Sequence, residues 1–241
     1  MRIFAISDLH LPGADKKAMD IFGPHWANHF ERIREDWLAR VTPEDTVLIP
    51  GDISWAMTLT EARQDLDALL ALPGRKVLLR GNHDFWWDSI SRVREYLLPG
   101  NAALQNDAIV CGDTVICGTR GWNCPGRNDF TAHDEHIYQR EAVRLRLSLD
   151  TARRKMPGVT PRVMLHYPPF NEKKQPSLFT ALFWEYGVRQ VIYGHIHGRS
   201  PTPYEGWLDG VHYRLVSCDH LNFQLLEWPE VDAAGQAYPF E

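Results

Sequence analysis

Five apolar runs in this sequence each stop at polar side chains that can bind divalent metal ions. The runs and the side chains that follow them are Ile3–Ile6 with Asp8 and His10, Val47–Ile49 with Asp52, Val77–Leu79 with Asn82, His83 and Asp84, Val163–Leu165 with His166, and Val191–Tyr193 with His195 and His197. Continuous runs of Val, Ile and Leu are typical of parallel strands in a buried sheet. Because ligands of such sheets gather just past the carboxyl ends of the strands, we expect these segments to meet at one rim. The pattern predicts a binuclear metal site.

The types of ligand indicate which ions and which chemistry the site would serve. The set mixes carboxylates, imidazoles and one amide oxygen and contains no thiolate, which favours Mn²⁺, Fe²⁺ or Zn²⁺. Two divalent ions would outweigh the charges of Asp8 and Asp52, so the site would stay cationic. A cationic site suits an anionic phosphate ester. Two ions can also share a hydroxide nucleophile and stabilise both oxygens of an in-line displacement.

Local spacing predicts which side chains can converge. In an extended segment, side chains two positions apart point the same way. Asp8 and His10 can therefore bind one ion, and so can His195 and His197 if their segment is extended. Adjacent residues diverge, so one of Asn82 and His83 can bind metal while the other faces a substrate. Glycines at positions 51, 81 and 194 permit tight turns just past the strands.

The order of these motifs resembles that of a known protein family. The blocks are Asp8-x-His10, Gly51-Asp52, Gly81-Asn82-His83-Asp84, His166 and Gly194-His195-x-His197. In this order they resemble the signature of the calcineurin-like metallophosphoesterases. The resemblance spans residues 1–198, and all five blocks are present. The Trp-rich segments are similar to those of a small bacterial branch of predicted phosphohydrolases.

The resemblance assigns roles to the motif residues. It implies a first ion held by Asp8, His10, Asp52 and His197, and a second held by Asn82, His166 and His195, with Asp52 as the bridge. It implies that His83 protonates the leaving alkoxide or contacts the phosphate, and that Asp84 orients His83 or raises its pKa. The implied fold is a two-sheet β-sandwich flanked by helices, a four-layer arrangement.

The sequence between the motifs predicts a mixed α/β fold with two packed sheets in a single domain, residues 1–241. In the first half, helical spacing of apolar residues at His29–Arg40, Thr60–Leu72 and Trp86–Leu98 alternates with the strands. This order favours βαβ crossovers and parallel pairing. Thr60 is a candidate cap for the second helix, which Pro73 and Gly74 would end.

The second half has a different character. We expect a hairpin at Ala108–Cys111 and Thr114–Cys117, a long loop at Gly118–Asp134 and a surface helix at His136–Lys155. A shorter helix at Ser177–Tyr186 precedes the last ligand strand. The runs Val211–Ser217 and Phe223–Glu227 resemble a closing antiparallel pair.

Several residues near the motifs have two interpretations each. Asp84 could cap a helix starting near Phe85, or support the ligands. Phe85, Trp86 and Trp87 could stack on a substrate or anchor the third helix in the core. Ser54 and Trp55, next to Asp52, could contact substrate or pack.

Two arginines are further candidates for substrate contact. Arg80 and Arg120 could hold a phosphate oxygen or form ion pairs. Arg120 lies in a short glycine-bounded segment directly after a predicted strand. The histidines outside the motifs fit no ligand spacing, and we expect them to be structural or exposed.

Composition limits the partners and the location. The formal net charge is −5 with no block of Lys and Arg, which argues against long nucleic acids as partners. The four cysteines form no CxxC pair, and we expect reduced thiols. No apolar stretch approaches the length of a membrane span, and the N-terminus lacks a signal-peptide pattern. We therefore expect a cytoplasmic protein with a small phosphorylated substrate and no membrane partner; the sequence specifies no oligomeric state.

The leading hypothesis is a metal-dependent phosphoesterase, with the preference for diesters over monoesters implied by the resemblance alone. A nuclease or nucleotide phosphohydrolase acting on short substrates is one alternative. A non-catalytic binding scaffold of the same fold is another, which the loss of a metal ligand would favour. A metallo-β-lactamase-type hydrolase is disfavoured because the sequence contains no HxHxDH run.

Overall fold

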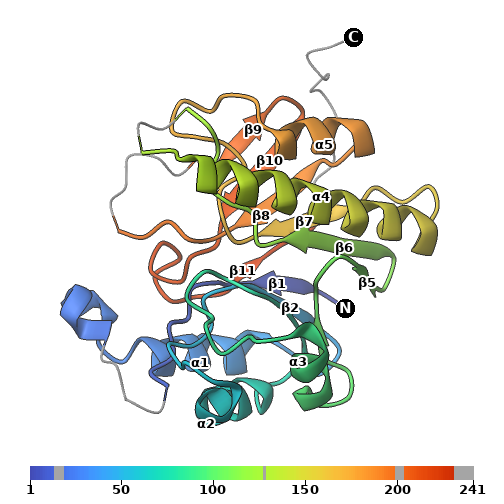
Figure 1. Cartoon of the computed structure of the whole chain (residues 1–241). Helices are drawn as coiled ribbons and strands as arrows, with labels where there is room; N and C mark the ends of the chain where they lie inside the picture. Colours follow the sequence, from blue (N-terminus) through green and yellow to red (C-terminus); the bar gives the residue numbers. More distant parts are fainter. Residues whose placement is uncertain (14–18, 127–128, 199–203, 231–241) are drawn as a thin grey trace. The chain divides into compact units, whose positions relative to one another are not determined.

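The apolar runs of the sequence form strands in two mixed sheets, one in each of two units of the chain. The computed structural model describes residues 1–13, 19–126, 129–198 and 204–230 (Figure 1). Unit 1 consists of Met1–Ala103 and Val216–Pro229, and unit 2 consists of Leu104–Leu215 with Glu230. Because the described chain returns to unit 1 after residue 215, unit 1 combines an N-terminal segment with a short C-terminal one.

The sheet of unit 1 has the order β11-β1-β2-β3-β4 among the described residues. Its strands are β1 (Ile3–Ala5), β2 (Thr46–Pro50), β3 (Arg75–Leu79), β4 (Ala102–Ala103) and β11 (Leu226–Glu227). Strands β1 to β4 run parallel, and β11 pairs antiparallel with β1. The predicted parallel pairing of the first three strands is confirmed. Their carboxyl ends therefore lie at one edge of the sheet.

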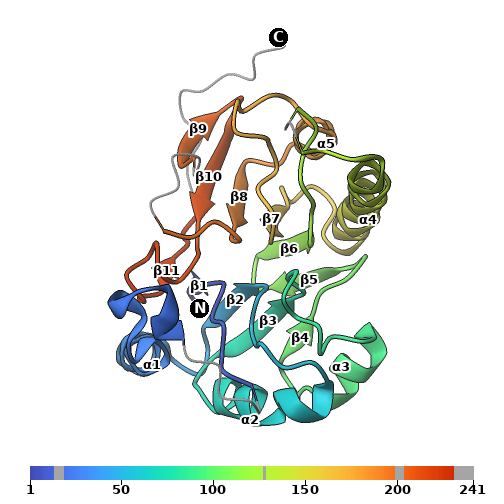
Figure 2. The same ribbon diagram turned by 60° about the vertical axis from the view of Figure 1, so that its left-hand side comes forward.

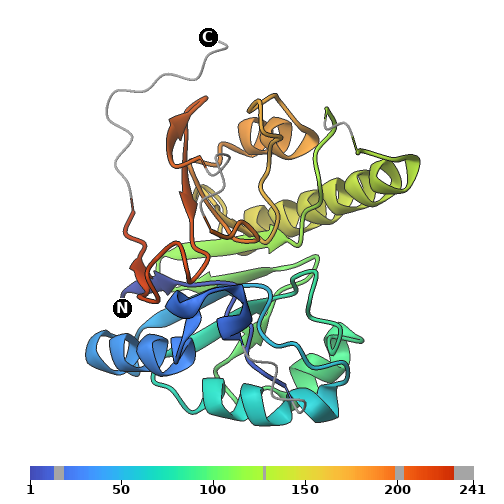
Figure 3. The same cartoon turned by 90° about the vertical axis from the view of Figure 1, so that its left-hand side faces the viewer.

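Three helices cover one face of this sheet, as the blue to green ribbon of Figure 3 shows. They are α1 (His29–Arg40), α2 (Leu59–Leu70) and α3 (Ile90–Tyr96), and two short 3-10 helices, η1 (Met19–Phe22) and η2 (Pro24–Trp26), precede α1. The apolar face of α1 buries Ile33 and Trp37 completely against the core that contains Phe4 and Val47. The helices thus fix the strands whose ends carry the first ligand motifs.

The sheet of unit 2 has the order β5-β6-β7-β8-β10-β9 among the described residues (Figure 2). Its strands are β5 (Ala108–Cys111), β6 (Thr114–Thr119), β7 (Arg162–Leu165), β8 (Gln190–Tyr193), β9 (Gly206–Leu208) and β10 (Val211–Leu215). Strands β6, β7, β8 and β10 run parallel, while β5 and β9 pair antiparallel at the two edges. The predicted hairpin of β5 and β6 is confirmed.

Helices α4 (Ala132–Lys155) and α5 (Leu178–Tyr186) pack on the sheet of unit 2. Leu145 and Leu149 of α4 and Phe179 and Phe183 of α5 are completely buried in one apolar core with Val163 of β7. Helix α5 begins where predicted because the Ser177 hydroxyl accepts hydrogen bonds from the backbone N–H groups of its first turn.

Three predicted helix starts are wrong, and capping explains each one. Thr58, not Thr60, caps α2 in a capping box with Glu61. Helix α3 begins at Ile90 with Ser89 as its cap, not at Trp86. Helix α4 begins at Ala132, because Thr131 and Asp134 form a second capping box. The predicted loop from residue 118 is accordingly shorter, and residues 127 and 128 within it lie outside the described part.

The predicted closing pair of strands is also wrong. Strand β10 pairs parallel with β8 and antiparallel with β9, while β11 pairs with β1 in the other unit. The two runs therefore belong to different sheets, which their similar apolar patterns could not show. Among the described residues, no helix combines the length and the apolar character that a membrane span requires.

Candidate metal-binding residues in the two units

In unit 1, the loops that follow β1 and β2 run side by side and bring the first ligands together. The Asp8 N–H donates to the Gly51 carbonyl at 3.0 Å, and the His10 N–H donates to the Asp52 carbonyl at 3.0 Å. These bonds place His10 Nε2 3.8 Å from Asp52 Oδ2. Asp8, His10 and Asp52 are all buried, with exposed fractions of 3% or less. Asn82 follows the third parallel strand and is half-buried.

The backbone of four of the predicted ligand residues is left-handed rather than extended. The φ angles are 57° at Asp8, 45° at His10, 52° at Asp52 and 71° at His195. The expectation that Asp8 and His10 converge through alternation along an extended strand is therefore wrong, and the same holds for His195 and His197. Non-glycine residues adopt this conformation only at a cost, and such strain clusters at functional sites. The turns after the strands, not the strands themselves, direct these side chains.

The carboxylate of Asp8 is held by two serine hydroxyls. Ser7 Oγ and Ser217 Oγ both donate to Asp8 Oδ2, the second at 3.0 Å. Cys218 Sγ lies 2.9 Å from the Asp8 carbonyl, and burial raises the pKa of this thiol well above its usual value. Ser7 and Ser217 were missed because their only sequence signal is a position directly after an apolar run.

Asp52 is fixed from the loop that follows β3. The His83 N–H donates to Asp52 Oδ1 at 2.8 Å. A Cβ atom at Gly81 would overlap both Oδ1 and the backbone N of Asp52. Gly81 is therefore required for close approach of the two loops, rather than for a positive φ.

Asp84 binds the backbone of both loops. Its carboxylate accepts hydrogen bonds from the N–H groups of Asp52 at 2.9 Å, Ile53 at 2.8 Å, Ser54 at 3.3 Å and Gly81 at 2.7 Å, and from the Trp86 indole at 2.9 Å. Burial raises its pKa, and these donors oppose that shift. The alternative of a helix cap is wrong, since α3 starts only at Ile90. Asp84 instead shapes the loop that carries Asp52.

Trp55 packs against the imidazoles of His10 and His83. Its ring is stacked on His10 with centroids 4.7 Å apart and lies 4.5 Å from His83. Phe85 is half exposed, whereas Trp86 and Trp87 are buried, as the core interpretation predicts. Trp55 therefore limits the rotation of two motif residues.

Ser54 packs within unit 1. Its hydroxyl donates to Asp65 Oδ2 at 2.5 Å and accepts from the Ala56 N–H at 3.2 Å, and its side chain is buried. These two bonds favour the packing interpretation over substrate contact.

In unit 2, the ends of β7 and β8 place two imidazoles together. The ring centroids of His166 and His195 lie 5.1 Å apart, and the Gly194 N–H donates to the His166 carbonyl at 3.1 Å. Tyr167 lies 4.0 Å from His195 with an interplanar angle of 32°, a contact that the sequence interpretation missed. His197 follows two residues after His195 in the same loop.

Arg120 interacts within unit 2. Its guanidinium lies 3.9 Å from Glu141 Oε1 and 4.7 Å from the centre of the Trp122 ring. The Arg120 carbonyl accepts hydrogen bonds from the N–H groups of His166 and Tyr167 at 3.2 and 2.9 Å. Arg120 thus forms the ion pair that one of its two interpretations predicts. The backbone of Arg120 also supports the loop that carries His166.

The donors present in both units fit divalent metal ions of the predicted type. Unit 1 offers carboxylate oxygens of Asp8 and Asp52 beside the His10 imidazole. Unit 2 offers the imidazoles of His166 and His195, whose rings are in contact. Hard carboxylate oxygens with neutral imidazoles suit Mn²⁺, Fe²⁺ and Zn²⁺. The hydroxyls on Asp8 are the kind of outer support that metal-binding carboxylates commonly have.

A family model described as calcineurin-like phosphoesterase matches residues 1–199. The chain belongs to this family. The match covers more than four fifths of the sequence and contains all seven predicted ligands. Family membership assigns the chain to metal-dependent hydrolysis of phosphate esters as a general class.

The matches to individual proteins are either short or low in sequence identity. Over 87 residues the chain is 44% identical to the Gene 66 protein of Mycobacterium phage D29, a match that covers 34% of this chain and 40% of that protein. The chain thus spans about two fifths of the length of this curated relative.

Two solved structures show the same fold. A phosphopantetheinyl hydrolase from Mycobacterium tuberculosis is 16% identical, with a TM-score of 0.55 over 98% of both chains. A protein of unknown function from Aquifex aeolicus is 16% identical, with a TM-score of 0.53 over 94% of this chain and 95% of that chain. The predicted class of two mixed sheets flanked by helices is confirmed.

Proposed function

We propose that this protein hydrolyses a small phosphate ester, a diester in preference to a monoester, with two divalent ions as cofactors. The observation that carries the proposal is the arrangement in unit 1, where buried Asp8, His10 and Asp52 are fixed by paired loops with His10 and Asp52 3.8 Å apart. The family match supports it, because residues 1–199 include the histidines of unit 2 as well. The preference for diesters rests on family resemblance.

Seven side chains would hold the ions. We assign the first ion to Asp8, His10, Asp52 and His197, and the second to Asn82, His166 and His195, with Asp52 shared between the two. When bound, such ions make a water acidic enough to attack phosphorus at neutral pH and stabilise charge on the ester oxygens. Mn²⁺, Fe²⁺ and Zn²⁺ all suit these donors.

His83 would supply the proton for the leaving group. In the proposed reaction the water loses one proton to solvent and its oxygen bonds to phosphorus, one ester P–O bond breaks, and a ring proton of His83 moves to the departing alkoxide. The backbone of His83 is fixed by Asp52, and its ring lies against Trp55. Asp84 orients the Asp52 loop through the hydrogen bonds described above, so we assign it a positioning role.

A matched pair of proteins tests this function. Metal-free wild-type protein supplied with Mn²⁺ should hydrolyse bis-p-nitrophenyl phosphate, measured as p-nitrophenolate release. His83→Ala should bind the same amount of Mn²⁺ and lose about 100-fold or more in kcat on a dialkyl phosphodiester, since a positioned acid contributes that much to the departure of a basic alkoxide. The loss on bis-p-nitrophenyl phosphate should be smaller, because p-nitrophenolate leaves without protonation.

Three results would count against the proposal. Wild-type protein that binds Mn²⁺, Fe²⁺ and Zn²⁺ but turns over no phosphate ester would favour a binding scaffold of the same fold. Normal turnover of a dialkyl phosphodiester by His83→Ala would remove His83 from the mechanism. Faster hydrolysis of short oligonucleotides or nucleotides than of other diesters would favour the nuclease alternative.

We further propose that the chain acts as one domain in the cytoplasm, without long nucleic acids or membranes as partners. The net charge of −5 supports the exclusion of long polyanions.

A further inference from the structure

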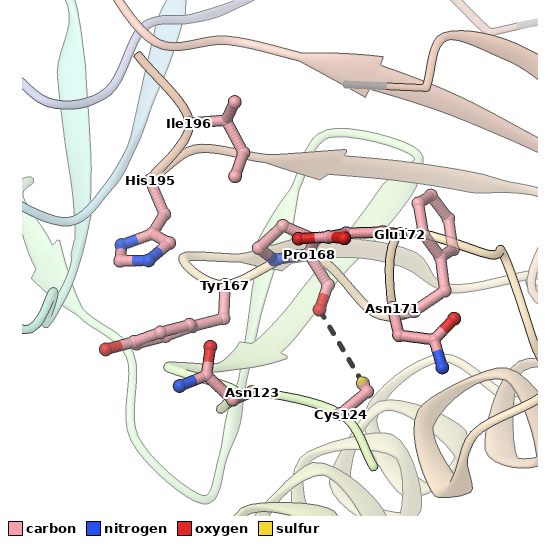
Figure 4. A pocket seen from close by; sticks show the side chains of 9 residues that line it. Asn123, Cys124, Tyr167, Pro168, Asn171, Glu172, His195 and Ile196 are labelled. Atoms are coloured by element: carbon pink, nitrogen blue, oxygen red, sulfur yellow. Dashed lines mark hydrogen bonds between the residues drawn. The ribbon is translucent and has the colours of Figure 1, made fainter. Parts of the chain in front are cut away.

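A pocket of about 60 Å³ lies in unit 2 beside the predicted ligand His195 (Figure 4). Tyr167 and His195 form one wall of it, with their rings 4.0 Å apart. Trp122 packs behind Tyr167 with ring centroids 4.9 Å apart, which limits movement of that wall. Asn123 and Ile196 also line the pocket. The pocket is therefore built mainly from side chains that other contacts hold in place.

The size of the pocket limits what can enter it. A cavity of roughly 10–15 Å³ is large enough to hold one water molecule. A volume of about 60 Å³ therefore accepts a group of a few non-hydrogen atoms, such as a two-carbon chain with one polar end.

Two polar residues of the pocket lining, Asn171 and Cys124, supply no charge to a ligand. The Asn171 amide N–H groups donate to the Pro125 carbonyl and to Gln175 Oε1, both at 2.7 Å, so this residue stabilises the pocket rim. Cys124 Sγ lies 3.9 Å from the Pro168 carbonyl, and burial raises the pKa of this thiol to about 12. Cys124 therefore contributes a neutral surface.

The charged side chains of the lining have one sign, while the ion assigned to His195 would face the phosphate of the ester. Among the described residues that line it, Glu172 is the acidic side chain, and none is a lysine or an arginine. In Figure 4 the Glu172 side chain extends toward the side where His195 and Tyr167 lie. The nearby Lys174 ammonium lies over the Tyr204 ring at 4.3 Å, outside this lining. The lining thus favours a cationic group and disfavours a second anionic one.

We propose that this pocket receives the alcohol part of the substrate and selects a short chain that ends in an ammonium group, with Glu172 as the residue that determines this specificity. The proposal rests on the proposed function, because only hydrolysis at the ions places the ester next to His195. Anionic alcohol parts, such as those ending in a carboxylate, are disfavoured. Because Glu172 is exposed to solvent, we expect a modest effect of about threefold to fivefold.

Three matched substrates test the proposal in the Mn²⁺-loaded protein. They are p-nitrophenyl phosphodiesters whose second alcohol is 2-aminoethanol, ethylene glycol or glycolate. Wild-type kcat/KM should be about threefold to fivefold higher for the aminoethyl than for the hydroxyethyl ester, and lowest for the carboxymethyl ester. Glu172→Gln should remove the preference for the aminoethyl ester, mainly through KM, and Glu172→Lys should favour the carboxymethyl ester. Glu44→Gln, a change of an exposed carboxylate in unit 1, is the control.

A binding measurement separates failure of this inference from failure of the proposed function. Metal-free protein is titrated with ethanolamine and with ethylene glycol while ligand NMR signals report binding. Ethanolamine should bind more tightly than the glycol, and Glu172→Gln should weaken ethanolamine alone. Equal binding of the two probes, or binding that Glu172→Gln leaves unchanged, would overturn the proposal even if the enzyme is active. Loss of all hydrolysis with intact ethanolamine selectivity would instead contradict the proposed function.

Discussion

At the scale of single residues, the predicted ligands of unit 1 depend on donors outside the ligand motifs. Asp8 accepts from Ser7 and Ser217, while the Asp52 backbone is held by Asp84. A buried carboxylate without such partners would be protonated or poorly placed. These donors keep the carboxylate oriented for a cation. Ser217 is notable because residue 217 lies beyond the part of the chain that the family model matches.

Ser217→Ala tests this support. Removing one of two hydroxyl donors should weaken Mn²⁺ binding by about tenfold, since outer-shell partners typically contribute that much. Isothermal titration of metal-free protein with Mn²⁺ measures the effect directly and does not require turnover. Ser91→Ala, an exposed position on α3, is the matched control and should bind like the wild type. Unchanged affinity in Ser217→Ala would show that Ser7 alone is sufficient.

At the scale of elements, tight loops join helices to strands and fix the strand ends. The clearest case in unit 1 is Asp45, between α1 and β2. Its buried carboxylate accepts from the Arg2 N–H at 2.6 Å, the Arg2 guanidinium at 3.0 Å and the Thr42 N–H at 3.0 Å. Burial raises the pKa of Asp45, but the hydrogen bonds from Thr42 and Arg2 outweigh this and lower the pKa to about 2. The ionised carboxylate therefore ties the start of β1 to the start of β2.

This loop predicts a pH dependence of stability. Because the folded pKa of Asp45 is below its usual value of 3.8, its stabilisation is present above that value and is lost as the pH falls toward about 2. Asp45→Asn should reduce the free energy of unfolding by about 2 kcal/mol near neutral pH. The difference from the wild type should shrink as the pH falls from about 4 to about 2.

Urea unfolding of both proteins across this pH range measures the difference. Asp88→Asn, which removes one partner of an exposed pair with Arg92, should change stability by about 0.5 kcal/mol or less. A difference between Asp45→Asn and wild type that stays constant with pH would contradict the assigned role of ionised Asp45.

At the scale of the whole chain, the sequence predicts the strands better than the helix ends. Val47–Ile49 and Val191–Tyr193 lie within β2 and β8, because a buried parallel strand requires an apolar residue at nearly every position. Helix starts depend on single capping residues. Thr58 and Thr60 are chemically equivalent, and only the pairing of Thr58 with Glu61 distinguishes them.

Two features of the candidate site could not be predicted from sequence. The left-handed backbone at Asp8, His10 and Asp52 is set by hydrogen bonds between loops that are remote in sequence. The contact of Ser217 with Asp8 joins residues 209 positions apart and follows no spacing rule. Long-range pairing of this kind is decided by the fold, so local patterns do not encode it.

The central claim is that seven side chains hold two ions with Asp52 between them, and the number of bound ions tests it most directly. Metal-free wild-type protein is dialysed to equilibrium against Mn²⁺, and bound manganese is measured per chain by elemental analysis. We predict two ions per chain in the wild type and reduced occupancy of both in Asp52→Asn. A single ion in the wild type, or loss of only one ion in Asp52→Asn, would contradict the claim.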